Sequence, residues 1–365
     1  MAGRRWRLER VDFLSGTGGS FRSLWLRGRR RLAEEIARRL PILTLPEHGY
    51  TLALGEMREL AAREPADWFI AHTQAALPVA AAAAVRWNAH LGFDCEDLLA
   101  HAPNEPRVLL RAIEAKYLPG CDYVSTASPL MAEQLVRDHA IPPPAVLYNV
   151  FPLELARGML APRERPADGG VRLHWFGQTI GPGRGLEDAV AALARLPGEV
   201  ELHLRGNPAA GYREKLEALA GKERKRLIFL PPIEHDQVIR AMESFDIGLA
   251  LEAPDHGNYS RTVTNKFFSH LLAGLAVAAS DTPGQRQVMS RIRGAGFLYP
   301  AGNAGALAEG LMSWVRDRQS LRVAQQAAWQ GARTCFCWDR EREKFLALFH
   351  APAPAEALIA GGTTA

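Results

Sequence analysis

The stretch HWFGQTIGPGRGLEDAV, residues 174–190, joins the end of an apolar strand to a glycine-rich turn and the start of a helix. The turn contains Gly177, Gly181, Gly183 and Gly185. Glycines let the backbone approach a phosphate closely, and a helix beginning near Leu186 offers unpaired N–H groups to an anion. Arg184 adds a charge that can bind a pyrophosphate through two hydrogen bonds. A tight structural turn accounts for the same glycines equally well, so this stretch alone leaves a phosphate site open.

Short apolar runs alternate with helical patterns on both sides of this stretch. Strands are expected at 11–14, 42–45, 68–71, 123–126, 145–148, 171–176, 200–204, 227–229, 247–251 and 276–279. Helices are expected at 54–63, 77–90, 108–117, 186–196, 213–220, 236–244, 265–273 and 284–291. Such alternation predicts an α/β fold in which parallel sheets are covered by helices on both faces.

A proline- and glycine-rich segment at 142–170 separates two such series and is the expected linker. We therefore predict a Rossmann-like domain over 1–155 and a second over 165–335. A helix at about 336–350 is expected to pack back onto the first domain, and 351–365 is expected to form a flexible tail. Two domains of this kind face each other across a cleft, which is lined by the loops at the carboxyl ends of the strands.

Composition favours an ordinary globular protein without a metal centre. The chain has 365 residues, of which 47% are hydrophobic and 23% charged, enough for two packed cores. Its four cysteines show no zinc spacing, and their scarcity fits a reducing compartment. No signal peptide is evident, and the most apolar run, 75–85, is too short to cross a bilayer. We therefore expect a cytoplasmic protein, which at most rests on the inner face of a membrane.

The first 39 residues carry eleven arginines against four acidic residues. Within 21–39, a helical pattern places Phe21, Trp25, Leu32 and Ile36 on one face, with arginines on the others. Aromatic and basic residues together suit an anionic membrane surface, and a helix packed on the sheet with solvated arginines is the alternative. No recognised nucleic-acid-binding fold accompanies the charge, so nucleic acid is not an expected partner.

A second informative stretch is SRTVTNKFFSHLLAGLAVAASDTPGQRQV at 260–288. With FDIGLALE before it and AGFLYPAGNAGALAEGL after it, it resembles the donor half of the retaining glycosyltransferases of family four. That family has an Asn-Lys-Leu-Phe-Glu helix that ends at glycine, followed by an Ala-Gly-x-Pro-Val strand. The counterparts here are Asn265, Lys266, Phe267, Phe268, Gly274 and Val277. The turn at 177–185 is similar to the family's phosphate loop, with Arg184 in place of its lysine. CFCWDREREKFLALF at 335–349 is similar to its closing helix.

The first half resembles the same family more loosely, so that the resemblance covers about 65–350. ADWFIAHT is similar to a family strand that ends in histidine, here His72, and GFDCEDLL at 92–99 to its Tyr-Asp-x-His-Glu segment. His72, Asp94 and Glu96 are therefore the candidate catalytic residues for orienting sugar and acceptor. The alternatives are a core or capping histidine, and a loop that caps a helix near Leu98. Gly16, Gly18 and Gly19 resemble the glycine loop after the family's first strand.

The resemblance implies the GT-B fold and transfer of a sugar, with retention, from a nucleotide diphosphate. A glycan or lipid-linked acceptor in polysaccharide or glycolipid assembly would receive it. No metal and no separate cofactor are expected, because helix dipoles and basic side chains neutralise the leaving group. The candidate donor-binding residues are Gly177, Gly183, Arg184, Asn265, Lys266 and Ser269. Asn265 is also a candidate helix N-cap, and Lys266 opposes the dipole at a helix start, which favours a functional role.

One departure from the family keeps a second hypothesis open. Many members carry two glutamates eight positions apart, the second of which binds the donor ribose. The corresponding residues here are Arg261 and Ser269. Because Ser269 is shorter and uncharged, a catalytically silent GT-B-fold binding or scaffold subunit is the alternative to an active enzyme.

Overall fold

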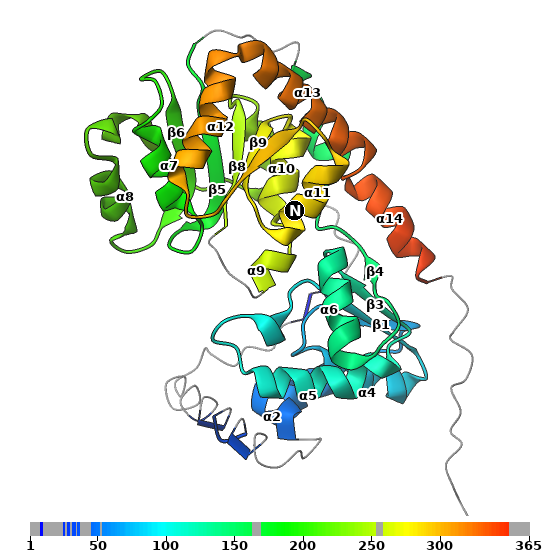
Figure 1. Ribbon diagram of the computed structural model, residues 1–365. Helices are drawn as coiled ribbons and strands as arrows, with labels where there is room; N and C mark the ends of the chain where they lie inside the picture. Colours follow the sequence, from blue (N-terminus) through cyan, green and yellow to red (C-terminus); the bar gives the residue numbers. More distant parts are fainter. Residues whose placement is uncertain are drawn as a thin grey trace, which may run out of the picture. The chain divides into compact units, whose positions relative to one another are not determined.

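The computed structural model divides by its internal contacts into two units (Figure 1). The residues it describes are 8–9, 25, 28–29, 31–33, 35–36, 45–51, 53–162, 169–252 and 258–349. Unit 1 comprises Met1–Val146 and Leu348–Ala365, and unit 2 comprises Leu147–Ala347. The boundary falls inside the proline- and glycine-rich segment 142–170. The last helix, α14 (Trp338–Ala347), is grouped with unit 2, and from Leu348 onward the chain is grouped with unit 1.

Unit 1 contains a four-stranded parallel sheet in the order β1-β2-β3-β4. Its strands are β1 (Trp68–Ala71), β2 (His90–Cys95), β3 (Tyr123–Thr126) and β4 (Ala145–Val146). Its helices are α2 (Leu45–Tyr50), α3 (Leu54–Ala61), α4 (Leu77–Trp87), α5 (Arg107–Tyr117) and α6 (Pro129–His139). Phe93 of β2 is fully buried and packs in one cluster with Leu77, Ile113 and Met131 from α4, α5 and α6. These three helices thus contribute apolar side chains to the core of the sheet.

Unit 2 contains a six-stranded parallel sheet in the order β10-β9-β8-β5-β6-β7. Its strands are β5 (Arg172–Ile180), β6 (Glu201–Pro208), β7 (Leu227–Leu230), β8 (Ile247–Ala250), β9 (Ala276–Ser280) and β10 (Gly296–Tyr299). Its main helices are α7 (Leu186–Leu193), α8 (Tyr212–Ala220), α9 (Asn258–Arg261), α10 (Asn265–Ala273), α11 (Pro283–Arg291), α12 (Ala304–Arg316) and α13 (Arg318–Thr334). Every residue of β8 and β9 is buried, as expected for central strands of a parallel sheet that is covered on both faces.

The α/β fold with two parallel sheets is confirmed, and most expected elements are present within a few residues. Two strands were missed. In β2, Gly92 interrupts the apolar pattern because the ring of Tyr123 lies against it: a Cβ at Gly92 would be 2.4 Å from that ring. The other missed strand, β10, lies at the edge of its sheet.

Other differences are local. The strand expected at 171–176 continues to Ile180, because it pairs with β6 beyond an irregularity between Phe176 and Thr179. The helix expected at 236–244 is instead two 3₁₀ turns, His235–Gln237 and Arg240–Met242. Residues 11–14, 42–44 and the glycines at 16, 18 and 19 lie outside the described residues, and Leu45 begins a helix rather than ending a strand.

Within the described parts of the chain, no helix is both long and apolar enough to cross a bilayer.

Candidate functional site

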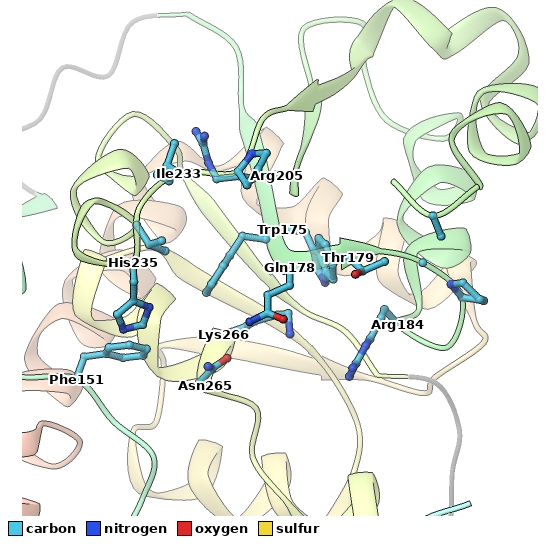
Figure 2. A pocket seen from close by; sticks show the side chains of 17 residues that line it. Phe151, Trp175, Gln178, Thr179, Arg184, Arg205, Ile233, His235, Asn265 and Lys266 are labelled. Atoms are coloured by element: carbon cyan, nitrogen blue, oxygen red, sulfur yellow. The ribbon is translucent and has the colours of Figure 1, made fainter. Parts of the chain in front are cut away.

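A cavity of about 650 Å³ lies within unit 2, at the carboxyl ends of β5, β6 and β7 (Figure 2). It is lined by Phe151, Trp175, Phe176, Gly177, Gln178, Thr179, Gly181, Pro182, Arg184, Arg205, Ala209, Pro232, Ile233, His235, Val238, Asn265 and Lys266. Figure 2 shows Phe151 and His235 at one end of the view and Arg184 at the other. The size and the mixed aromatic and cationic lining suit a small anionic ligand with an aromatic group.

The glycine-rich turn forms one wall of this cavity. Gly177 is required by its neighbour, because a Cβ there would lie 2.6 Å from the buried ring of Trp175. Gly183 and Gly185 have φ angles of 79° and 62°, which favour glycine. Gly185 directly precedes α7, whose first-turn N–H groups therefore face the end of the turn. Gly183 is not among the residues that line the cavity, whereas Gly177 is.

The start of α10 forms the opposite wall. Thr264, not Asn265, is the N-cap residue: its hydroxyl accepts a hydrogen bond of 3.2 Å from the backbone N–H of Lys266. The N-cap interpretation of Asn265 is therefore wrong, and its exposed side chain lines the cavity instead. The two sequence stretches that carry the family resemblance thus meet in one cavity.

Ser269 is not part of this lining. It is fully buried, and its hydroxyl donates to the carbonyl oxygen of Asn265 at 2.8 Å, one helical turn earlier. The structure therefore brings together Gly177, Arg184, Asn265 and Lys266 and places Ser269 behind them.

Lys266 lies in a desolvated position. Its Nζ is 5.4 Å from the centroid of the Trp175 ring, within the range of a cation–π interaction. Burial lowers the pKa of Lys266, and the charge of Glu252 opposes that shift. Arg184 Nη1 lies 3.6 Å from Glu252 Oε2, and the charge of Lys266 also acts on Glu252.

Several lining residues were missed by sequence reasoning. Arg205, near the end of β6, donates a hydrogen bond of 3.0 Å to the carbonyl oxygen of Pro231. Trp175, Gln178 and His235 also line the cavity. The signal that could have found Arg205 and His235 is position, since each lies at or just beyond the carboxyl end of a predicted strand. Glu252 gave a similar signal, as a carboxylate that directly follows a wholly apolar strand.

In unit 1, two of the three candidate catalytic residues are neighbours. His72 follows β1, and its Nδ1 lies 3.2 Å from Asp94 Oδ2. Ser125 on β3 donates a hydrogen bond of 2.6 Å to the other oxygen of Asp94. Asp94 lies inside β2 rather than after it, and Glu96 is exposed beyond the strand end. The short helix at Leu99–His101 has no side-chain cap, so Asp94 and Glu96 do not cap it.

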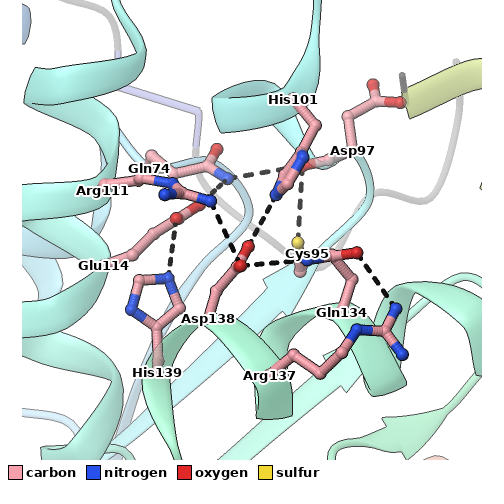
Figure 3. Close-up of polar contacts among 10 residues, drawn as sticks. All are labelled: Gln74, Cys95, Asp97, His101, Arg111, Glu114, Gln134, Arg137, Asp138 and His139. Atoms are coloured by element: carbon pink, nitrogen blue, oxygen red, sulfur yellow. Dashed lines mark hydrogen bonds and ion pairs between the residues drawn. The ribbon is translucent and has the colours of Figure 1, made fainter. Parts of the chain in front are cut away.

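A polar network lies under the same strand ends (Figure 3). Gln74 donates hydrogen bonds to the Asp97 carbonyl oxygen at 3.3 Å and to the Glu114 carboxylate at 3.0 Å. The other oxygen of Glu114 lies 3.0 Å from Nε2 of the buried His139. These contacts tie the loops after β1 and β2 to α5 and α6, and so restrict the movement of His72 and Asp94.

Two parallel-sheet α/β units of four and six strands, the second with a glycine turn and a helix start around one cavity, define the GT-B fold. Similar solved structures belong to glycosyltransferases. HepE of Anabaena in complex with UDP and glucose matches with a TM-score of 0.66 and 18% identity, over 82% of this chain and 81% of that one.

Two further structures agree. Sucrose-phosphate synthase from Thermosynechococcus elongatus has a TM-score of 0.65 and 18% identity, over 87% of this chain and 79% of that one. A glycosyltransferase from Rickettsia africae has a TM-score of 0.62 and 14% identity, over 93% and 83%. No protein-family model matches the chain, and no curated protein matches its sequence. At these identities, the comparisons establish the fold.

Proposed function

We propose that this protein is a glycosyltransferase that binds a nucleotide-diphosphate sugar in the cavity of unit 2. The observation that carries the proposal is the convergence of the 177–185 turn and the α10 start around one 650 Å³ cavity, with Arg184 and Lys266 in its lining. Cations and helix N-termini stabilise the charge that develops on a departing diphosphate. The solved complexes of HepE with UDP and with UDP-glucose support a nucleotide donor for this fold.

The donor groups can be assigned to parts of the cavity. The diphosphate fits between Arg184 and Lys266, where full charges are available. The aromatic ring of the base fits the end formed by Phe151 and His235, whose rings lie 5.8 Å apart, because stacking suits any base. Asn265 supplies an amide for a sugar or phosphate oxygen.

The acceptor we propose is a glycan or lipid-linked glycan in polysaccharide or glycolipid assembly, with His72 and Asp94 binding its hydroxyl groups. Asp94 holds His72 by one oxygen and is held by Ser125 through the other, which leaves the exposed side of the imidazole available. Retention of configuration and independence from metal are part of the proposal. They rest on the family resemblance and on the two cations that can neutralise the leaving group.

A nucleotide screen tests the donor proposal. UDP, GDP, ADP and their glucose or mannose conjugates are added to the full chain, and the melting temperature is followed. A true ligand at about 100 times its Kd should add about 2.7 kcal/mol of stability. The best donor is then incubated with chelator and short glycan or polyprenyl-glycan acceptors. Release of nucleoside diphosphate, together with a product that keeps the donor's anomeric configuration, would support the proposed enzyme. If no nucleotide raises the melting temperature, the proposal is contradicted.

A silent binding or scaffold subunit is the second candidate, and the position of Ser269 is the observation that favours it. Ser269 is buried with its hydroxyl bonded to the helix backbone, so it does not supply a ribose ligand at the cavity surface. Stabilisation by a nucleotide without release of diphosphate from any sugar conjugate would favour this candidate.

We also propose that 21–39 binds an anionic membrane surface. Of its expected apolar face, Trp25 and Leu32 are exposed, Ile36 is half-buried, and Phe21 lies outside the described residues. Arg29 lies 5.1 Å from the Trp25 ring. Vesicles with and without anionic lipid test this by flotation, and a Trp25→Ser, Leu32→Ser variant should float less. Equal recovery of the full chain with both kinds of vesicle would contradict it.

A further inference from the structure

The carboxylate of Glu252 lies among the cations of the proposed diphosphate site. Its side chain is 5% exposed, and Oε2 is 3.6 Å from Arg184 Nη1. Glu252 is not needed to complete the sheet, because β8 ends at Ala250. Burying a carboxylate costs free energy. Its position beside the cations that are expected to bind an anionic ligand therefore suggests a function for Glu252.

The backbone of Glu252 is anchored to the hydroxyl of Ser280. Its N–H donates to Ser280 Oγ at 2.9 Å, and its carbonyl oxygen lies 3.0 Å from the same hydroxyl. On the other side, a Cβ at Gly185 would lie 3.1 Å from Leu251 Cβ and 3.6 Å from the Glu252 nitrogen. Because Gly185 has no side chain, the glycine-rich turn 177–185 can pack directly on residues 251 and 252.

Among the described residues, the charged and titratable groups near Glu252 come from the turn before α7, from α10 and from β10. Arg184 precedes α7, Lys266 begins α10, and Tyr299 ends β10, with its phenol 3.0 Å from Asp188 Oδ2 of α7. Burial raises the pKa of Glu252, whereas the charges of Lys266 and Arg184 act in the opposite direction. These two cations therefore favour the ionised carboxylate, against the larger effect of burial.

We propose that Glu252 is the internal counter-ion of the diphosphate site: it holds Arg184 and Lys266 before the donor arrives and takes up a proton when the donor's phosphates replace it. This inference rests on the proposed function. The diphosphate brings negative charge to the cations that favour the ionised form of Glu252, and like charges in a desolvated site favour the neutral acid. The proton comes from solvent and binds a carboxylate oxygen, and no covalent bond of the donor changes.

Proton uptake by Glu252 would make the affinity for the donor depend on pH. A group whose pKa is higher in the complex than in the free protein binds a proton on complex formation, so donor affinity rises as pH falls through the pKa of the complex. Below the pKa of the free protein, the affinity reaches a plateau. A residue that only supports the fold would not produce this dependence.

Isothermal titration calorimetry in two buffers of different ionisation enthalpy measures the proton uptake. The probes are UDP-glucose, GDP-mannose and ADP-glucose, since their diphosphate diesters have no group that titrates near neutrality. The proteins are the full-length wild type, Glu252→Gln and Glu187→Gln. Glu187 is a matched carboxylate on α7 that pairs with Lys215 at 2.9 Å and does not line the cavity.

We expect the wild type and Glu187→Gln to take up at least about 0.3 proton per bound donor at pH 6.5. Glu252→Gln should take up none and should bind about tenfold more tightly at pH 7.5, because a negative charge is removed beside the phosphates. Binding by the wild type without proton uptake, or equal uptake by Glu252→Gln, would overturn the inference and leave the proposed function standing. If none of the probes binds the wild type, both fall. If Glu252→Gln does not fold, binding by the wild type without proton uptake still overturns the inference.

Discussion

In unit 2, His174 and His270 are buried among aromatic and apolar side chains, whereas in unit 1 His72, His101 and His139 each lie within 3.2 Å of a carboxylate oxygen. The first arrangement keeps imidazole neutral, and the second supplies it with a hydrogen-bond partner. In unit 2, the charges near the cavity are those of Arg184, Arg205, Lys266 and Glu252. The two units therefore differ in their chemistry: Lys266 and Glu252 near the cavity of unit 2 are largely desolvated, whereas those histidines of unit 1 each face a carboxylate.

Lowering the pH should reveal the difference between the buried histidines of unit 2 and the paired histidines of unit 1 most strongly, as a loss of stability. Burial lowers the pKa of His270 to about 3 and that of His174 well below its ordinary value, and neither ring has a hydrogen-bond partner among the described residues. Because both histidines stay neutral in the fold, the unfolded chain binds more protons below pH 6.5, and stability falls as pH drops. Between pH 7.5 and 5.0 each should cost about 2 kcal/mol of unfolding free energy.

Urea unfolding at the two pH values measures this loss. A His270→Phe variant removes one titrating group, so its loss on acidification should be about 2 kcal/mol smaller than that of the wild type. His90→Gln is the control, since His90 is exposed in unit 1 and faces Asp122 at 3.1 Å. If His270→Phe and the wild type lose the same stability, the neutral buried histidine is not the cause.

Removing the cations of unit 2 should have the next largest effect. Lys266→Ala and Arg184→Ala should each weaken nucleoside diphosphate binding by about a hundredfold, because a charge-assisted contact to phosphate is lost. Lys215→Ala and Arg213→Ala are matched controls on α8, where both side chains are exposed and paired with glutamates. Calorimetric titration gives the affinities. If both cavity variants bind nucleoside diphosphate as tightly as the wild type, the diphosphate does not bind between Arg184 and Lys266.

The sequence predicted unit 2 better than unit 1 for a physical reason. Central strands such as β8 and β9 are buried on both faces, so they appear as continuous apolar runs. β2 does not, because the polar residues His90 and Asp94 stand among its apolar ones. The extension of β5 to Ile180 depends on its partner strand β6.

The same distinction holds for the candidate site. Arg184 and Lys266 follow from local signals, a glycine turn and a cation at a helix start. Glu252 was missed because its role depends on those two side chains, which lie 68 and 14 positions away in the sequence. Asn265 was assigned as an N-cap because asparagine is a better capping residue than threonine. The backbone conformation and the hydrogen bond from Lys266 N–H instead place the cap at Thr264.

The smallest predicted effect concerns His72, and it separates the two units most cleanly. His72→Ala should lower the rate of sugar transfer about tenfold, less than the loss of a general acid or base, because His72 only positions a hydroxyl. Nucleotide affinity should stay unchanged because the donor cavity lies wholly in unit 2. His72→Gln should recover part of the rate, since an amide can still bond to Asp94. His90→Gln is again the control, because its imidazole also faces an aspartate but lies at the opposite, amino-terminal end of the sheet. Transfer rates at saturating donor, with acceptor concentration varied, make the measurement. A loss of nucleotide affinity in His72→Ala would mean that His72 acts on the donor, and an unchanged rate would leave the pair with Asp94 a structural contact.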